Sequence, residues 1–323
     1  VYKRQVREGR KLFAEHKIPS FINPESAVAA LGFLHAYHRN QKMLLEVPEP
    51  LAMQQAPDIR GARLIIEAAL SERRNQLSAL ETRALLHAFH IPVSPALAAR
   101  TPNEALSAAE CLGFPVVLKI LSPDITHKTD ADGVRLNIDS AEQVRNACHE
   151  LLASVRARQP DARLDGVMVE KMYRNRHGRE LLLGIMTDPT FGPVISFGAG
   201  GIAVNLTDDR AVALPPLNEA IAENLIQQTR MAQWLRGYRN FPPIRHQALI
   251  QTLLRLSEMA CELPEIMELD INPLVADETG VMALDARIVV KTPPQTRHRY
   301  GHMAIHPYPS HLIQRFQTAD GTS

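Results

Sequence analysis

MELDINPLVADETGVMALD, residues 267–285, consists of two apolar-rich runs on either side of an Asp-Glu-Thr-Gly turn. This pattern predicts two paired strands joined by a tight turn. Alternation in the first run places Glu268, Asp270 and Asn272 on one face of its strand, and the hairpin can bring Asp285 beside them. We therefore expect a cluster of four oxygen-bearing side chains at this position.

The chemistry of these four side chains favours Mg²⁺. Carboxylate and amide oxygens suit this hard cation, which commonly takes one or two carboxylates and completes its shell with water and nucleotide phosphate. A surface hairpin with merely solvated acidic side chains is the simpler alternative, because short motifs often match by chance.

Length and composition bound the class of protein. A chain of 323 residues with 45% hydrophobic residues can form two domains, or one large domain with an appendage. Lys and Arg number 36 against 35 for Asp and Glu, so overall charge gives no case for a nucleic-acid or membrane partner. Because the sequence has no signal-peptide pattern and no run of roughly 18 apolar residues, we expect a cytoplasmic protein.

The order of predicted elements divides the chain into four parts. Residues 1–45 predict a helix, a short strand at 18–22 and a second helix, a piece of an α/β domain too short to bury itself. The Pro-rich residues 46–57 predict a linker. Residues 58–292 predict an α/β domain, and residues 293–323 an exit linker. We expect the chain to be a piece of a longer protein.

Within residues 58–292, helix start signals alternate with short apolar runs. The start signals are Asp58, Ser78 with Glu81, Thr101 with Glu104, and Ser140. The apolar runs predict strands at 90–93, 114–120, 135–138, 166–172, 180–186 and 193–197.

Lys119 is an anomaly inside the apolar strand 114–120. Its ammonium group needs an anionic partner, a shifted pKa or a path to solvent at the sheet edge. The following loop, 122–134, is polar and contains His127 and Lys128, so it can fold over phosphates. His127 could accept a phosphoryl group, because neutral imidazole is nucleophilic near pH 7; a solvated loop histidine is the simpler alternative.

Two acidic residues and a glycine cluster also lie where ligands often bind. Glu170 and Glu180 are at strand ends, a common place for ligand contacts in sheet proteins. Residues 198–201, Gly-Ala-Gly-Gly, would let backbone N–H groups approach an anion closely. Tight turns use the same residues, so the cluster alone is a weak signal.

Together these motifs resemble the ATP-grasp domain of the ADP-forming acyl-CoA synthetases, which are similar to succinyl-CoA synthetase. The resemblance covers residues 58–292 and implies an α/β ATP-grasp fold of two α/β subdomains that grip ATP. It also implies that residues 1–45 are the C-terminal unit of a flavodoxin-like CoA-ligase domain. The segments that carry it are LGFPVVLKI, SPDITHKTDADGV, GVMVEKM, GRELLLGIMTDPTFGPVISFGAGGI, ELDINPL and ALDARI.

The resemblance implies ATP and Mg²⁺ as cofactors and a role for each matching residue. It implies that Lys119 and Lys128 contact phosphates and that Gly200 and Gly201 lie near the phosphate path. Glu170 and Met172 would line the adenine hinge, and Glu180 would hold the ribose. Asn272 and Asp285 would hold Mg²⁺, and His127 would receive or relay phosphate.

The flanking segments refine the family. AYHRNQK, AVALPPLN and MAIHPYPSHLIQRFQTADGTS resemble the bacterial protein lysine acetyltransferases of the Pat type, in which a synthetase-like region is fused to a GNAT acetyltransferase domain. Asn205 stands where synthetases commonly carry an acidic residue, which weakens the prediction of full synthetase chemistry.

Three functions follow from these resemblances and their alternatives. The first is a regulatory ATP/Mg-binding module of such an acetyltransferase, whose GNAT domain would lie outside this chain. The second is a working ADP-forming acyl-CoA synthetase subunit, making acyl-CoA from acid, CoA and ATP through phosphohistidine. The third is a purely structural α/β scaffold. Expected partners are nucleotide, CoA or acetyl-CoA bound through domains outside the chain, lysine substrates only with a GNAT domain, and a second copy of the chain.

Overall fold

The computed structural model describes residues 2–45, 55–125, 128, 131–174, 176–201, 209–292 and 300–306. The chain divides into two compact units, residues 1–48 and 49–323, and the division falls in the segment predicted as a linker. None of the helices in the described ranges combines the length and the apolar character needed to cross a bilayer.

The first unit contains two helices, α1 (Tyr2–Glu15) and α2 (Pro24–Leu45). The strand predicted at 18–22 is wrong, because these residues are irregular. A strand needs a hydrogen-bonding neighbour, and the described part of this unit offers only helices. Several apolar side chains of the unit are exposed, among them Ile22, Leu31 and Phe33. Its relation to a flavodoxin-like domain stays a prediction.

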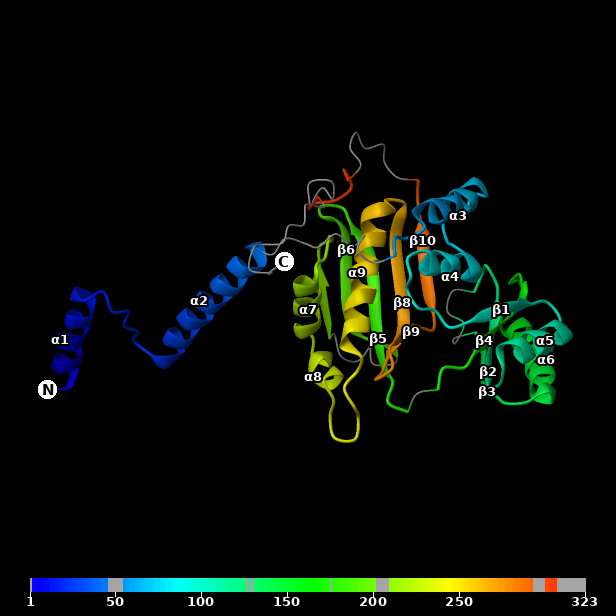
Figure 1. The fold of residues 1–323 in the computed structure, drawn as a ribbon, viewed down its shortest axis with the longest axis horizontal. Helices are drawn as coiled ribbons and strands as arrows, with labels where there is room; N and C mark the ends of the chain where they lie inside the picture. The colour runs from blue at the N-terminus through cyan, green and yellow to red at the C-terminus, as the bar shows by residue number, and fades with distance from the viewer. Residues whose placement is uncertain are drawn as a thin grey trace, which may run out of the picture. The chain divides into compact units, whose positions relative to one another are not determined.

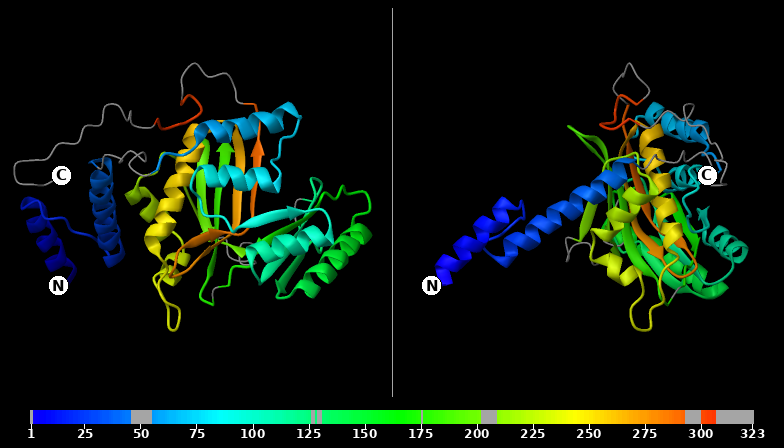
Figure 2. Two further views of the ribbon diagram at one scale, coloured as in Figure 1. Left: turned by 45° about the vertical axis from the view of Figure 1, so that its right-hand side comes forward. Right: turned by 60° about the vertical axis from the view of Figure 1, so that its left-hand side comes forward.

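The second unit contains two antiparallel sheets, of which the smaller has four strands in the order β1-β4-β2-β3. Helices α5 and α6 pack against each other and against this sheet (Figures 1 and 2). The elements are β1 (Ala96–Ala99), α5 (Pro102–Leu112), β2 (Val116–Leu121), β3 (Val134–Ile138), α6 (Ala141–Arg158) and β4 (Gly166–Lys171).

The larger sheet follows the order β10-β8-β5-β6-β7, with β9 paired to β8. Five helices share one core with it, and the longest of them, α9, runs along the sheet in Figure 1. The strands are β5 (Arg179–Asp188), β6 (Gly192–Ala199), β7 (Arg210–Ala213), β8 (Ile266–Ala276), β9 (Val281–Ala283) and β10 (Ala286–Val290). The helices are α3 (Ile59–Ser71), α4 (Ala79–Ala88), α7 (Glu219–Gln227), α8 (Met231–Leu235) and α9 (His246–Glu262).

The hairpin predicted from residues 267–285 is confirmed. Strands β8 and β9 pair around the turn 277–280, which the hydrogen bond from Asp277 N–H to Gly280 O closes at 2.9 Å. Leu269 and Ile271 are fully buried whereas their neighbours in β8 are partly exposed, as the alternation predicted. The four predicted helix starts are also confirmed as N-caps: Asp58, Ser78, Thr101 and Ser140.

The strand predicted at 90–93 is wrong. Only Val93 pairs there, in a single parallel bridge to Ala283. The apolar residues of this run pack in the core, as Ile91 shows with 1% exposure, so burial rather than strand pairing explains the pattern. The first strand of the small sheet begins instead at Ala96.

Part of the predicted exit linker packs on the second unit. Met303 is buried, the Tyr300 hydroxyl hydrogen-bonds Glu262 Oε1 at 2.9 Å, and the His302 ring contacts the Ala260 carbonyl at 3.1 Å. Residues 300–306 therefore belong structurally with the second unit rather than with a free linker.

Helix α4 begins with a charged capping box. The Ser78 hydroxyl accepts the Glu81 N–H, and the Glu81 carboxylate accepts the Ser78 N–H at 2.7 Å. The Arg74 guanidinium donates to both oxygens of the same carboxylate, at 2.7 and 2.9 Å. These bonds, first the one from Arg74, lower the pKa of Glu81 from 4.5 to about 2.

We expect Glu81→Gln to reduce the free energy of unfolding by about 1 kcal/mol at pH 7, because glutamine keeps the shape but loses the charge. The pKa of Glu81 is depressed on folding, so its stabilisation is complete above about 4.5 and is lost as pH falls toward 2. Urea unfolding of both proteins between pH 7 and pH 3 would measure this. The control is Glu72→Gln, which removes an exposed carboxylate bound to the same arginine. If the difference in free energy of unfolding between Glu81→Gln and wild type were the same at pH 7 and pH 3, this expectation would be contradicted.

Candidate functional site

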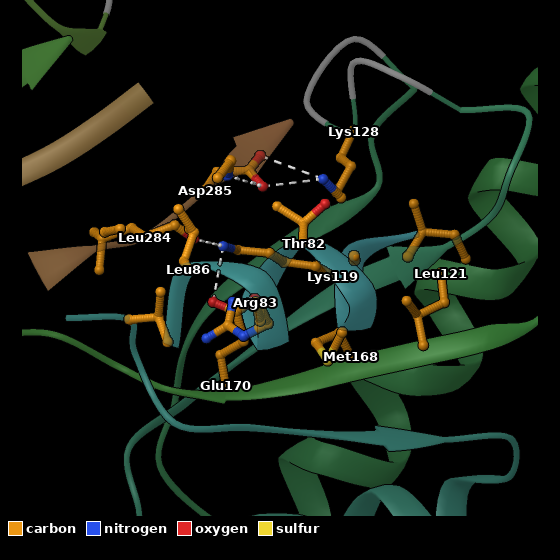
Figure 3. Close-up of a pocket in the computed structure, with 15 residues that line it drawn as sticks. Thr82, Arg83, Leu86, Lys119, Leu121, Lys128, Met168, Glu170, Leu284 and Asp285 are labelled. Atoms are coloured by element: carbon orange, nitrogen blue, oxygen red, sulfur yellow. Dashed lines mark hydrogen bonds and ion pairs between the residues drawn. The ribbon is translucent and has the colours of Figure 1, made fainter. Parts of the chain in front are cut away.

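Two lysines, one in strand β2 of the small sheet and one in the loop after it, meet the segment between β9 and β10 of the large sheet. Lys119, in β2, donates from Nζ to the Leu284 carbonyl at 2.6 Å. Lys128 reaches the neighbouring Asp285 carboxylate, with Nζ 3.1 Å from Oδ1 and 3.3 Å from Oδ2. Figure 3 shows both amines pointing into one pocket. The structure therefore brings together groups that are more than 150 residues apart in sequence.

Glu170 is the buried acidic group of this pocket. Its carboxylate lies 2.8 Å from Lys119 Nζ and 3.1 Å from Arg83 Nη1, and its side chain is 6% exposed. Register explains the first contact, because β2 and β4 are adjacent antiparallel strands in which Lys119 pairs with Met168 and Val117 with Glu170. The Glu170 carboxylate is thus engaged by two cations, and its place at the adenine hinge stays a prediction.

A second group of predicted residues continues from Asp285 along the large sheet. The Asn272 N–H donates to the Asp285 carbonyl at 3.1 Å, and Asn272 Oδ1 accepts the Gly201 N–H at 2.9 Å. Gly201 has φ 62°, and a Cβ there would lie 1.7 Å from Glu180 Oε2. The positive φ favours glycine at this position, whereas the Glu180 carboxylate lies at the end of a flexible side chain. A chain of contacts therefore connects Lys119 to Glu180 through Leu284, Asp285, Asn272 and Gly201.

Gly200 also permits close backbone packing. Its N–H donates to the Glu180 carbonyl at 2.9 Å, and an added Cβ would lie 2.4 Å from the Leu181 carbonyl. The glycine pair thus holds the end of β6 against the start of β5, beside the exposed Glu180 side chain. This places the glycines predicted for the phosphate path next to the glutamate predicted for the ribose.

The predicted cluster of four oxygen-bearing side chains is only partly formed. Asn272 and Asp285 are neighbours, but Glu268 lies 3.4 Å from Arg287 Nη1, farther along the sheet. Burial and the charge of Glu268 raise the pKa of Asp270, against the opposing effect of Arg210 and Arg287. Among the described residues, no three His, Cys, Asp or Glu side chains are grouped closely enough to hold a metal ion.

The donor set at Asn272 and Asp285 nevertheless fits Mg²⁺. It consists of an amide oxygen and a carboxylate whose side chain is 43% exposed, and hard oxygen donors of this kind with open positions are typical of nucleotide-bound magnesium. Glu268 and Asp270 are better described as charged groups of the sheet face than as ligands of the same ion.

One predicted position that the structure describes stands apart from this network. The Met172 N–H is taken by the Pro115 carbonyl at 3.1 Å, and Met172 does not line the pocket. His127 and Asn205 lie outside the described residues.

Sequence reasoning missed two pocket residues, Thr82 and Arg83 of α4. Thr82 is 2% exposed, and its Oγ1 has no hydrogen-bond partner within the described part of the chain. Arg83 binds Glu170 and also donates to the Ser94 carbonyl. Both follow the capping box in an ordinary amphipathic helix, so their sequence context carries no signal of a site.

Comparison with known proteins places this geometry in a family. A model of the ATP-grasp domain matches residues 68–290. The beta subunit of acetate–CoA ligase [ADP-forming] I from Pyrococcus furiosus is 39% identical over 232 residues, which are 72% of this chain and 99% of that subunit. Acetate–CoA ligase [ADP-forming] I from Archaeoglobus fulgidus is 35% identical over 88% of this chain, which spans 41% of that enzyme.

Solved structures of one enzyme agree with this placement. The dinucleotide forming acetyl-coenzyme A synthetase 1 of Ca. Korarchaeum cryptofilum, in complex with coenzyme A, Ca-AMPCP and HgCl⁺, matches with TM-score 0.69 and 35% identity. The match covers 71% of this chain and all of that chain. A form of the same enzyme with coenzyme A and Mg-AMPPCP matches with TM-score 0.63 and 33% identity, and its phosphohistidine segment points towards the nucleotide binding site. The chain therefore belongs to the ATP-grasp domain family, as the ATP-grasp region of an ADP-forming acetyl-CoA synthetase-like protein.

Proposed function

We propose that this chain binds MgATP in the pocket between the two sheets, with the triphosphate beside Lys119 and Lys128. The observation that carries the proposal is the charge of the pocket lining. Arg83, Lys119 and Lys128 supply three cations, whereas Glu170 and Asp285 supply two carboxylates, which leaves an excess of one positive charge. An anionic ligand would balance this excess positive charge.

The buried hydroxyl of Thr82 supports the same proposal. A buried polar atom without a partner is uncommon in native structures, and a ligand at the site would supply one. Thr82 lies beside Lys119 in the pocket of Figure 3. A phosphate oxygen there could accept bonds from the hydroxyl and from the lysine amines.

Asn272 and Asp285 would hold Mg²⁺ in this arrangement, on the oxygen-donor grounds given above. When bound there, the ion would supply positive charge that offsets the charge of the phosphate oxygens. Lys128 would then move from the Asp285 carboxylate towards the phosphates. Glu180, with its carboxylate against Gly201, is the proposed ribose contact, and Met172 remains a proposed adenine contact through its side chain.

The activity of the whole protein is a further part of the proposal. The nucleotide site would serve ADP-forming acyl-CoA synthesis. In this reaction the γ-phosphoryl group would pass to a histidine as ADP leaves and then to the acid, and the CoA thiol would attack the acyl phosphate to form acyl-CoA and release inorganic phosphate. His127, which directly precedes Lys128 in sequence, is the proposed phosphate-receiving or relaying histidine. The rate of phosphoryl transfer depends mainly on neutralising the charge of the phosphate oxygens and on aligning the reacting groups.

A second candidate is a regulatory module of a protein lysine acetyltransferase, which binds nucleotide or acyl-CoA without turnover. The segments 36–42, 211–218 and 303–323 favour it through their resemblance to the Pat-type proteins. The two candidates share the MgATP pocket and differ in whether ADP is released.

We expect Lys119→Met and Asp285→Asn each to weaken MgATP binding by roughly tenfold or more, because each removes a charged contact to the ligand or its metal. Isothermal titration calorimetry on the full chain measures the dissociation constants. Lys291→Met is the matched control, since Lys291 is an exposed lysine that does not line this pocket. Equal losses in all three variants, or none, would contradict the assigned roles.

We expect His127→Ala to leave MgATP binding nearly unchanged and to abolish labelling of the protein by [γ-³²P]ATP. Release of ADP from acetate, CoA and MgATP, absent in Asp285→Asn, would support the ligase activity. Binding without ADP release would instead support the regulatory module. Loss of nucleotide binding in His127→Ala would show that the histidine has been given the wrong role.

A further inference from the structure

Glu170 is shared between two cations inside the pocket. Each carboxylate oxygen has its own partner, Oε1 with Arg83 at 3.1 Å and Oε2 with Lys119 at 2.8 Å. All three side chains are largely buried, with exposures of 16% for Arg83, 12% for Lys119 and 6% for Glu170. In Figure 3 the Arg83 guanidinium lies beside Glu170, and the Lys119 amine lies between Glu170 and the Leu284 carbonyl.

This arrangement creates a conflict for phosphate binding. Two of the three N–H bonds of Lys119 are used by Glu170 and Leu284, so only one is left for a ligand. A second bond to phosphate would require Lys119 to leave Glu170. Leaving a buried carboxylate unpaired costs several kcal/mol, and the carboxylate would also repel the triphosphate.

Arg83 can avoid this cost, because its guanidinium stays paired with the Glu170 carboxylate when Lys119 leaves. Its second nitrogen, Nη2, donates to the Ser94 carbonyl, and the Ser94 hydroxyl donates to the Lys171 carbonyl at 2.8 Å, next to Glu170 in sequence. The planar fork of an arginine holds such a pair of contacts in a fixed geometry, whereas a lysine amine on its flexible stem can change partners. Arg83 also comes from α4, whose first turn the capping box fixes.

We propose that Arg83 is a positioning residue that keeps Glu170 neutralised, so that the Lys119 amine can transfer from Glu170 to the phosphates of the nucleotide. Arg83 itself stays with Glu170 and Ser94 throughout. The inference deepens the proposed function and rests on it, because it presumes an anionic nucleotide in this pocket.

The proposal predicts a specific pattern in a double-mutant cycle. Arg83→Met removes one of the two cations that contact Glu170. Lys119 must then stay with this carboxylate, so MgATP binding should weaken on the order of tenfold or more. Glu170→Gln removes the carboxylate that retains Lys119, so this variant should bind MgATP more tightly than Arg83→Met does. The double variant should return to the level of Glu170→Gln, because there is no longer a carboxylate for Arg83 to neutralise.

Calorimetric titration of the full chain with MgATP, at one fixed salt concentration, measures all four proteins. Arg83→Lys keeps the charge but not the planar fork, so its affinity should fall between those of wild type and Arg83→Met. Arg83→Gln replaces Arg83→Met in the cycle if the methionine variant does not fold. Urea unfolding of each variant separates a loss of stability from a loss of binding.

The outcomes separate the inference from the function beneath it. Wild-type protein that binds no MgATP contradicts the proposed function. Wild-type binding with Arg83→Met unchanged overturns only the inference, and so does a loss that Glu170→Gln fails to reverse, because a merely structural arginine would produce it. An affinity of Arg83→Lys for MgATP that is no higher than that of Arg83→Met would show that charge neutralisation is the wrong explanation.

Discussion

Two lysine amines, from strand β2 of the small sheet and from the loop after it, contact the Leu284–Asp285 segment beside the large sheet, and this contact brings charged groups of both halves into one pocket. Lys119 bonds the Leu284 carbonyl and Lys128 the Asp285 carboxylate. Neither sheet alone carries both the two lysines and the proposed magnesium ligands. The lysines are on the small sheet and its following loop, whereas Asn272, Asp285 and Gly201 lie on the large one.

Buried charge determines what the pocket can accept. Glu170 is compensated by Arg83 and Lys119, and Asp285 by Lys128, so one cation is left over within the lining. A buried excess charge is unfavourable unless a counter-ion is near, and a nucleotide phosphate with its magnesium can provide one. The same principle links Arg83 on helix α4 to Lys119 in strand β2, because both side chains contact the Glu170 carboxylate. The family match agrees with a nucleotide as that counter-ion.

Local patterns in the sequence predicted the elements that local chemistry determines. The hairpin at 267–285 follows from alternation and its turn, and the helix starts follow from capping side chains. The strand predictions for residues 18–22 and 90–93 were wrong, because strand pairing depends on distant neighbours that an apolar run does not specify. Register placed Asn272 beside Asp285 but set Glu268 beside Arg287, a difference that no spacing rule shows. Arg83 was missed because its pairing with Glu170 joins positions 87 residues apart.

The resemblance supplied a prediction that the residues alone left open, namely that Lys119 and Lys128 would face the same ligand as Asn272 and Asp285. A crystal structure of the chain with Mg²⁺ and a non-hydrolysable ATP analogue tests this most directly. We expect the triphosphate beside the Lys119 and Lys128 amines, with the metal on Asn272 Oδ1 and the Asp285 carboxylate. A nucleotide bound elsewhere, with the Lys128–Asp285 ion pair still intact, would contradict it.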